Sequence, residues 1–164
     1  MSKSPAYEII KEWYNGRYTK RSALPLINHI DEGEVILDYV KAPEVVKDAY
    51  FLHPLLQADK DFLVHKSNPF TGVKGESIVL AMEYRWVANS FLSHNEVGDF
   101  VGFTCDDVKV MLIVDKIQNY KDFMLYHHGK HERSDELYEY FHIWFALLQI
   151  DYKKILQDCF DFSE

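Results

Sequence analysis

The 164-residue sequence contains little cysteine, glycine or proline, with 2 Cys, 7 Gly and 5 Pro. Two cysteines, Cys105 and Cys159, are too few for a disulfide scaffold or for a zinc site made of thiolates. The low glycine and proline content, together with 48% hydrophobic residues, excludes a collagen-like, low-complexity or disordered chain. We therefore expect residues 1–164 to form one domain with a full hydrophobic core.

Long hydrophobic runs are also missing. The longest, Val110 to Val114 and Ile143 to Leu148, are far shorter than the roughly 20 residues that span a membrane. The opening residues, MSKSPAYEIIKEW, carry charge where a signal peptide has its apolar stretch. These features predict a soluble protein of a reducing compartment, the cytoplasm, with no membrane partner.

Positive charge is in deficit, because 18 Lys and Arg face 26 Asp and Glu, for a net charge of −8 with His neutral. An acidic surface repels phosphate backbones on average, so nucleic acid is not the expected partner. The sequence also has no Gly-rich phosphate loop, no G-x-S-x-G elbow and no H-E-x-x-H pair.

What the sequence does contain is a series of helical signals. Ser4 and Pro5 predict an N-capped helix that runs to about Tyr14, where Asn15-Gly16 ends it. Residues 60–75 are predicted to form a long loop. The remaining helices are expected from about Pro25 to Leu37, from Pro43 to a kink or end at Pro54, from Glu76 to about Asn95, from the capping residue Thr104 to about Tyr126, and from the cap Ser134 to about Leu156 with an interruption near Asp151. The sequence thus predicts an all-α bundle of five to seven helices.

Three patterns follow one another along the chain. PLINH at 25–29 comes after a basic stretch, YFLHP ends at 54, and VMLIVDKIQN covers 110–119. Together they resemble the HD superfamily of metal-dependent phosphohydrolases, and above all the domain that removes the 3′-diphosphate from the alarmone ppGpp. That domain has a P-Y-I-x-H segment, an apolar helix ending in His-Asp and a V-K-L-A-D-K-L-x-N helix in the same order. The resemblance covers about residues 17–126 and implies an all-α, HD-like fold.

The resemblance implies that His29, His53 and Asp115 are three of the four protein ligands of a divalent metal ion. Imidazoles and a carboxylate suit Mn²⁺, Fe²⁺ or Zn²⁺, and such an ion makes a bound water acidic enough to attack phosphorus. The implied ligand is a nucleotide or a small phosphorylated molecule. The residues implied to contact it are Arg17, Lys20, Arg21 and Asn119.

The chain departs from the family at its carboxylates. Pro54 stands where the family has the Asp of its His-Asp pair, and Gln57 and Ala58 stand where it has the Glu-Asp pair that handles the attacking water. Asp59 is the remaining candidate for a catalytic carboxylate, brought inward by a kink at Pro54. We therefore expect ppGpp hydrolysis to be absent or very slow.

Two functions stay open at this point. One is a nucleotide-directed domain with an altered metal site, either a phosphohydrolase or a binder. The other is an inactive HD-fold scaffold that binds a protein partner or a second copy through its acidic surface and its aromatic C-terminal helix, which carries Tyr138, Tyr140, Phe141, Trp144 and Phe145. Under the second hypothesis the histidines are hydrogen-bonded core residues and Asp115 pairs with a cation such as Arg85. Convergence of His29, His53 and Asp115 on one point would favour the first.

Overall fold

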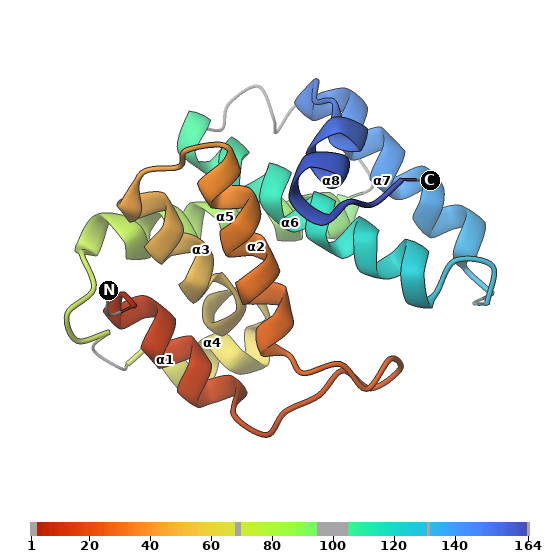
Figure 1. Ribbon diagram of the computed structural model, residues 1–164. Helices are drawn as coiled ribbons and strands as arrows, with labels where there is room; N and C mark the ends of the chain where they lie inside the picture. Colours follow the sequence, from red (N-terminus) through yellow and green to blue (C-terminus); the bar gives the residue numbers. More distant parts are fainter. Residues whose placement is uncertain (1–2, 68–69, 95–104, 131, 164) are drawn as a thin grey trace.

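The computed structural model describes residues 3–67, 70–94, 105–130 and 132–163 (Figure 1). These residues form helices and no β-strand, which confirms the all-α prediction. An isolated β-bridge joins Tyr18 to Pro25 at the base of the loop after the first helix. The helices are α1 Pro5–Tyr14, α2 Ile27–Tyr39, α3 Glu44–Gln57, α4 Asp59–His65, α5 Gly75–His94, α6 Asp106–Tyr126, α7 Ser134–Leu148 and α8 Tyr152–Phe160.

The helices share one hydrophobic core, which includes buried side chains from Ala6 in α1 to Leu156 in α8. Helix α3 packs against α1, α2, α4, α5 and α6, and α6 also contacts α2, α5, α7 and α8. In Figure 1, α6 runs between the group formed by α1 to α5 and the pair formed by α7 and α8. No helix of the described residues is long and apolar enough to cross a membrane.

The first helix forms as its local signals predict. The side chain of Ser4 accepts a hydrogen bond from the backbone N–H of Tyr7 at 3.3 Å, and Pro5 occupies the first helical position. The helix ends at Tyr14, and Gly16 follows with a positive φ of 69°.

The structure adds one helix to those predicted and confirms a predicted break. A short helix, α4, begins at Asp59 and takes up the first part of the expected loop, because Phe62 packs on the core and its N–H donates to the carbonyl of Ala58 at 2.8 Å. The interruption predicted near Asp151 is confirmed, because Gln149 has a φ of 54° and Asp151 caps α8 through the N–H of Lys154. Helix α8 continues to Phe160, past the predicted end near Leu156. The described residues therefore contain eight helices where five to seven were expected.

Two predicted caps have a different outcome. Ser134 begins α7 but does not cap it, because its hydroxyl accepts from the N–H of Gly129 at 2.7 Å. Thr104, the predicted cap of α6, lies outside the described residues, and Cys105 occupies the N-cap position without a capping side-chain hydrogen bond.

Helix α3 continues through Pro54 and ends at Gln57. Of the two outcomes predicted at Pro54, a kink or the end of the helix, the end is therefore wrong. The carbonyl groups at the end of α3 are satisfied from α5. Arg85 donates to the carbonyls of Leu56 and Gln57, and Asn89 donates to that of Gln57 at 3.0 Å.

Candidate metal centre

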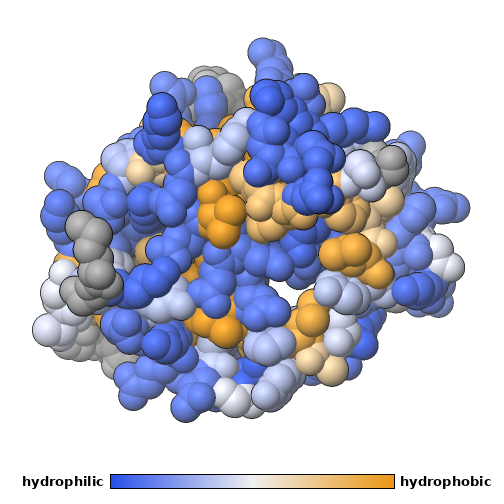
Figure 2. Space-filling model, viewed as in Figure 1, coloured by the Kyte–Doolittle hydropathy of each residue, from blue (hydrophilic) through white to orange (hydrophobic). Residues whose placement is uncertain are grey.

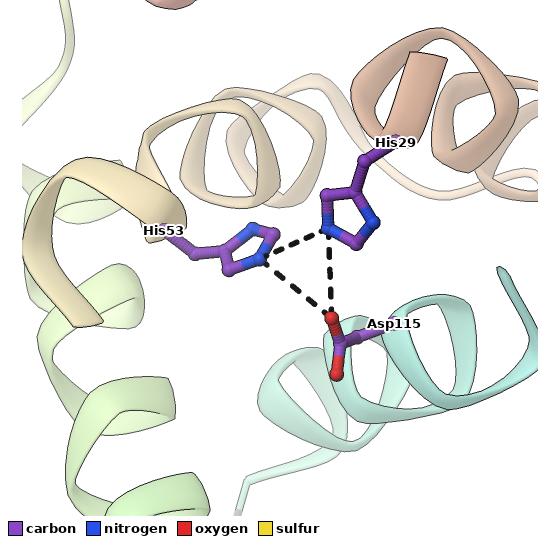
Figure 3. Close-up of side chains that lie close together, drawn as sticks. All are labelled: His29, His53 and Asp115. Carbon is purple, nitrogen blue, oxygen red and sulfur yellow. Dashed lines mark hydrogen bonds and ion pairs between the residues drawn. The ribbon is translucent and has the colours of Figure 1, made fainter. Parts of the chain in front are cut away.

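Helices α2, α3 and α6 bring His29, His53 and Asp115 together (Figure 3). The two Nε2 atoms are 3.3 Å apart, and Oδ1 of Asp115 lies 3.6 Å from Nε2 of His29 and 3.7 Å from Nε2 of His53. A point equidistant from the three atoms lies about 2.0 Å from each, which is the distance of nitrogen and oxygen ligands from zinc. This triad can hold a metal ion.

The imidazole of His53 is oriented by the backbone of its own helix. It is 2% exposed, and its Nδ1 lies 2.5 Å from the carbonyl oxygen of Tyr50. Because a carbonyl only accepts, Nδ1 carries the proton and the lone pair of Nε2 faces the triad. Burial lowers the pKa of His53 to about 3, with the neighbouring charge of His29 acting in the same direction. His53 is therefore neutral at neutral pH, the form that binds a metal.

The imidazole of His29 is oriented by a side chain, since its Nδ1 lies 2.5 Å from Oε1 of Gln118. The Nε2 of Gln118 donates to Glu32 at 2.9 Å and to Asp122 at 2.8 Å. Carboxylates only accept, so the amide group can take only this orientation and its oxygen must face His29. Lys121 lies 3.0 Å and 2.9 Å from the same two carboxylates and offsets part of their charge. Both histidines thus present a lone pair to one point, as metal-ligating histidines do.

The carboxylate of Asp115 is 5% exposed and has two hydrogen-bond donors on its own helix. Lys116 donates to Oδ2 at 2.9 Å, and Asn119 donates to Oδ1 at 2.8 Å. Burial by itself raises the pKa of Asp115, but Lys116, His29 and His53 together outweigh it and keep the pKa below the usual range. The alternative in which Asp115 pairs with a cation is met by Lys116, but the named partner Arg85 is wrong, because Arg85 pairs with Asp59.

Two buried tyrosines close the back of the triad, and sequence reasoning did not find them. The ring of Tyr50 lies on Gly33, where an added Cβ would come within 2.3 Å of it, and its hydroxyl donates to the carbonyl of His29 at 3.3 Å. The ring of Tyr84 contacts that of His53, with centroids 5.0 Å apart. Gly33 inside α2 was the one local signal for this packing. Glycine destabilises a helix, so its presence there indicates that another group packs closely against the backbone.

The triad lines a cavity of about 280 Å³ that also includes Pro54 and Gln57. A second cavity of about 630 Å³ adjoins it, since Thr19, Asn119 and Asp122 line both. It lies between the loop after α1 and helices α6 and α7, where Figure 2 shows the surface hollowed on a mostly hydrophilic face.

The structure brings three of the four predicted nucleotide contacts, Lys20, Arg21 and Asn119, to the lining of this second cavity. Arg17 instead lines a separate cavity, where its guanidinium lies 3.7 Å from the centre of the Trp13 ring. The buried cation Lys116 also lines the second cavity, and the sequence patterns did not assign it a role there.

The candidate catalytic carboxylate Asp59 is not brought to the triad. Its side chain is 86% exposed, pairs with Arg85, and is not among the residues that line either cavity. Gln57, at one position of the family's Glu-Asp pair, does line the smaller cavity but offers only an amide.

No protein-family model, curated protein or solved structure matches this chain. The resemblance to the HD phosphohydrolases therefore rests on the three sequence patterns.

Proposed function

We propose that this protein is an HD-like domain that binds a divalent metal ion at His29, His53 and Asp115 and takes a nucleotide-like, phosphate-bearing ligand in the adjoining cavities. The observation that carries this proposal is the triad, in which both imidazoles have their Nδ1 protons engaged and their Nε2 atoms directed at one carboxylate oxygen. Two histidines that only filled a core would need no such shared orientation.

The charges around the triad favour an anionic ligand. Lys116 neutralises Asp115. Lys121 partly neutralises the two carboxylates that accept hydrogen bonds from Gln118. A divalent ion would therefore keep most of its charge for an incoming phosphate or carboxylate.

The spacing of the donors favours Zn²⁺ among the three expected metals. Tetrahedral ligands of a zinc ion lie about 3.4 Å from one another, whereas neighbouring ligands of an octahedral ion lie about 3.0 Å apart. The separations of 3.3, 3.6 and 3.7 Å in the triad are closer to the tetrahedral value. Since Lys116 holds Oδ2 of Asp115, that carboxylate would bind through Oδ1 alone, which leaves one position for water or a ligand.

The larger cavity has the chemistry of a nucleotide site. Lys20 and Arg21 supply cations at its edge, whereas Phe123 and Tyr140 supply aromatic surface. A phosphate group and a planar ring on one molecule would match these two kinds of surface.

We infer that the protein binds such a ligand rather than hydrolysing it rapidly. A bound metal would supply an acidic water. Among the described residues that line the smaller cavity, however, the two carboxylates, Asp115 and Asp122, already accept hydrogen bonds on both oxygens. Gln57 cannot act as a base, so proton removal from water has no dedicated group there.

The first test is metal analysis of protein purified without chelators or a metal-affinity step, followed by calorimetric titration of the chelator-treated protein with Zn²⁺. We expect about one ion per chain, lost in His53→Ala and retained in His128→Ala, which removes an exposed histidine outside the triad. Co²⁺ in place of Zn²⁺ reports the geometry, because four-coordinate Co²⁺ absorbs visible light far more strongly than six-coordinate Co²⁺. Absence of metal from the wild-type protein would reject the proposal.

The ligand is tested with GDP on the Zn²⁺-loaded protein. The double variant Lys20→Ala/Arg21→Ala should weaken GDP binding about tenfold, the loss expected for charged hydrogen bonds. Lys153→Ala/Lys154→Ala removes the same charge at a distant cavity and should leave the affinity unchanged. Equal losses in both variants would show non-specific attraction only.

A scaffold that binds a protein partner or a second copy is the alternative proposal. Within α7, Phe141, Trp144 and Phe145 are buried in the core, which accounts for most of the aromatic content of that helix. Tyr138 and Ile143 remain 36% and 44% exposed and would contribute to such an interface. The metal analysis separates the two proposals.

A further inference from the structure

The proline of α3 and the orientation of His53 are linked through one carbonyl group. In an α-helix the N–H of residue 54 donates to the carbonyl of residue 50, but proline has no N–H. The carbonyl of Tyr50 is therefore left without its helical donor. That same carbonyl accepts the hydrogen bond from Nδ1 of His53, at 2.5 Å.

We propose that Pro54 is a positioning residue for the metal ligand His53. By withholding the backbone donor, it keeps the Tyr50 carbonyl available to the Nδ1 proton of His53. The bond sets both the tautomer and the rotation of the ring, so that the lone pair of Nε2 points at His29 and Asp115. This inference rests on the proposed metal site.

The surroundings make the exchange specific. Tyr50 is 0% exposed and His53 is 2% exposed, so neither the carbonyl nor the Nδ1 proton has water as a substitute partner. Each group would be left unsatisfied without the other. Pro54, in place of the Asp of the His-Asp pattern, thus has two effects. It removes a carboxylate, and it leaves the Tyr50 carbonyl free to accept from His53.

The test compares Pro54→Ala with the control Pro43→Ala. Pro43 lies at the N-cap of the same helix, where a missing N–H deprives no helical carbonyl. In Pro54→Ala the new N–H competes with Nδ1 of His53 for the Tyr50 carbonyl. We expect the Zn²⁺ affinity to fall about tenfold or more, while the metal-free protein unfolds at the same or a higher temperature because alanine favours a helix. Pro43→Ala should change neither quantity.

An unchanged Zn²⁺ affinity in Pro54→Ala would overturn the inference. A variant that lost affinity and thermal stability together would also overturn it, since the proline would then matter for packing alone. If the wild-type protein bound no Zn²⁺, the proposed function would be rejected. The link between Pro54 and the tautomer of His53 would then be tested in the metal-free protein.

That test uses the ¹⁵N chemical shifts of the His53 ring in the metal-free wild-type protein at neutral pH, which report which nitrogen carries the proton. We expect the Nδ1–H tautomer, and an increased share of the Nε2–H tautomer in Pro54→Ala. An Nε2–H tautomer in the wild-type protein would overturn the inference even if the variant failed to fold.

Discussion

The amide of Gln118 joins the imidazole of His29 to two carboxylates on neighbouring helices, with its oxygen 2.5 Å from Nδ1 of His29. The residue is 0% exposed, so this bond has no substitute in water. Orientation of a metal ligand by a buried neighbour in this way makes the affinity for metal sensitive to a residue that never touches the ion.

Gln118→Leu should therefore weaken Zn²⁺ binding by 10- to 100-fold, since His29 loses the acceptor that sets its tautomer. It should also destabilise the metal-free protein by about 1–3 kcal/mol because Glu32 and Asp122 lose a donor. Calorimetric titration and urea unfolding measure the two effects. Gln157→Leu, at an exposed position in α8, is the matched control, and a similar loss there would contradict the argument.

Gly33→Ala should destabilise the protein although alanine is the better helix former. Its Cβ would meet the buried ring of Tyr50 at 2.3 Å, and the ring has no room to retreat beside His29 and His53. We expect a loss of about 1–3 kcal/mol in the free energy of unfolding. Gly75→Ala, where nothing lies within 4 Å of the new atom, should be neutral or stabilising. Equal effects at the two glycines would show that Tyr50 is not tightly held.

Lys116→Met should be strongly destabilising in the metal-free protein. The change leaves the carboxylate of Asp115 buried without its ion pair, for which the expected loss is about 3–5 kcal/mol. Saturating Zn²⁺ should recover part of this loss, because the ion supplies a new positive charge to Asp115. Thermal unfolding with and without Zn²⁺ measures the recovery. Lys109→Met removes a half-exposed lysine paired with Asp106 and should cost less than about 1 kcal/mol.

The metal-free protein should lose stability as the pH falls below about 6.5. Because the pKa of His53 is lowered to about 3 in the folded state, the unfolded chain binds a proton at higher pH than the folded chain does. The contribution is complete above the unfolded pKa and falls by up to about 1.4 kcal/mol per pH unit between about 6.5 and 3. Urea unfolding of the wild-type and His53→Gln proteins across this pH range isolates the contribution of His53. If the free energies of unfolding of the two proteins changed equally with pH, the lowered pKa of His53 would be refuted.

Hydrolysis of ppGpp should be absent or far slower than about 1 s⁻¹, the lower end of ordinary enzymatic rates. The physical reason is the position of the carboxylates, since Asp59 pairs with Arg85 away from the triad and Gln57 carries an amide. Release of pyrophosphate from ppGpp by Zn²⁺- and Mn²⁺-loaded protein measures the rate. Turnover at 1 s⁻¹ or faster would mean that another group acts as the base.

The sequence by itself determined the elements whose signals are local. Ser4 and Pro5 begin α1 because the cap and the proline act within one helical turn, and Asp151 marks the break before α8 for the same reason. The motif order also named His29, His53 and Asp115, which the structure places within hydrogen-bond or ion-pair distance of one another.

Only the tertiary structure decided how these side chains are oriented and which charges balance them. Gln118 faces His29 because α6 packs on α2, and the ring of Tyr50 fits because Gly33 has no side chain. Both contacts join residues far apart in the chain. Asp59 was assigned an inward position from the sequence, but Arg85 of α5 holds it outside. Hydrogen bonds between helices depend on the packing of whole helix faces, which no local pattern of residues specifies.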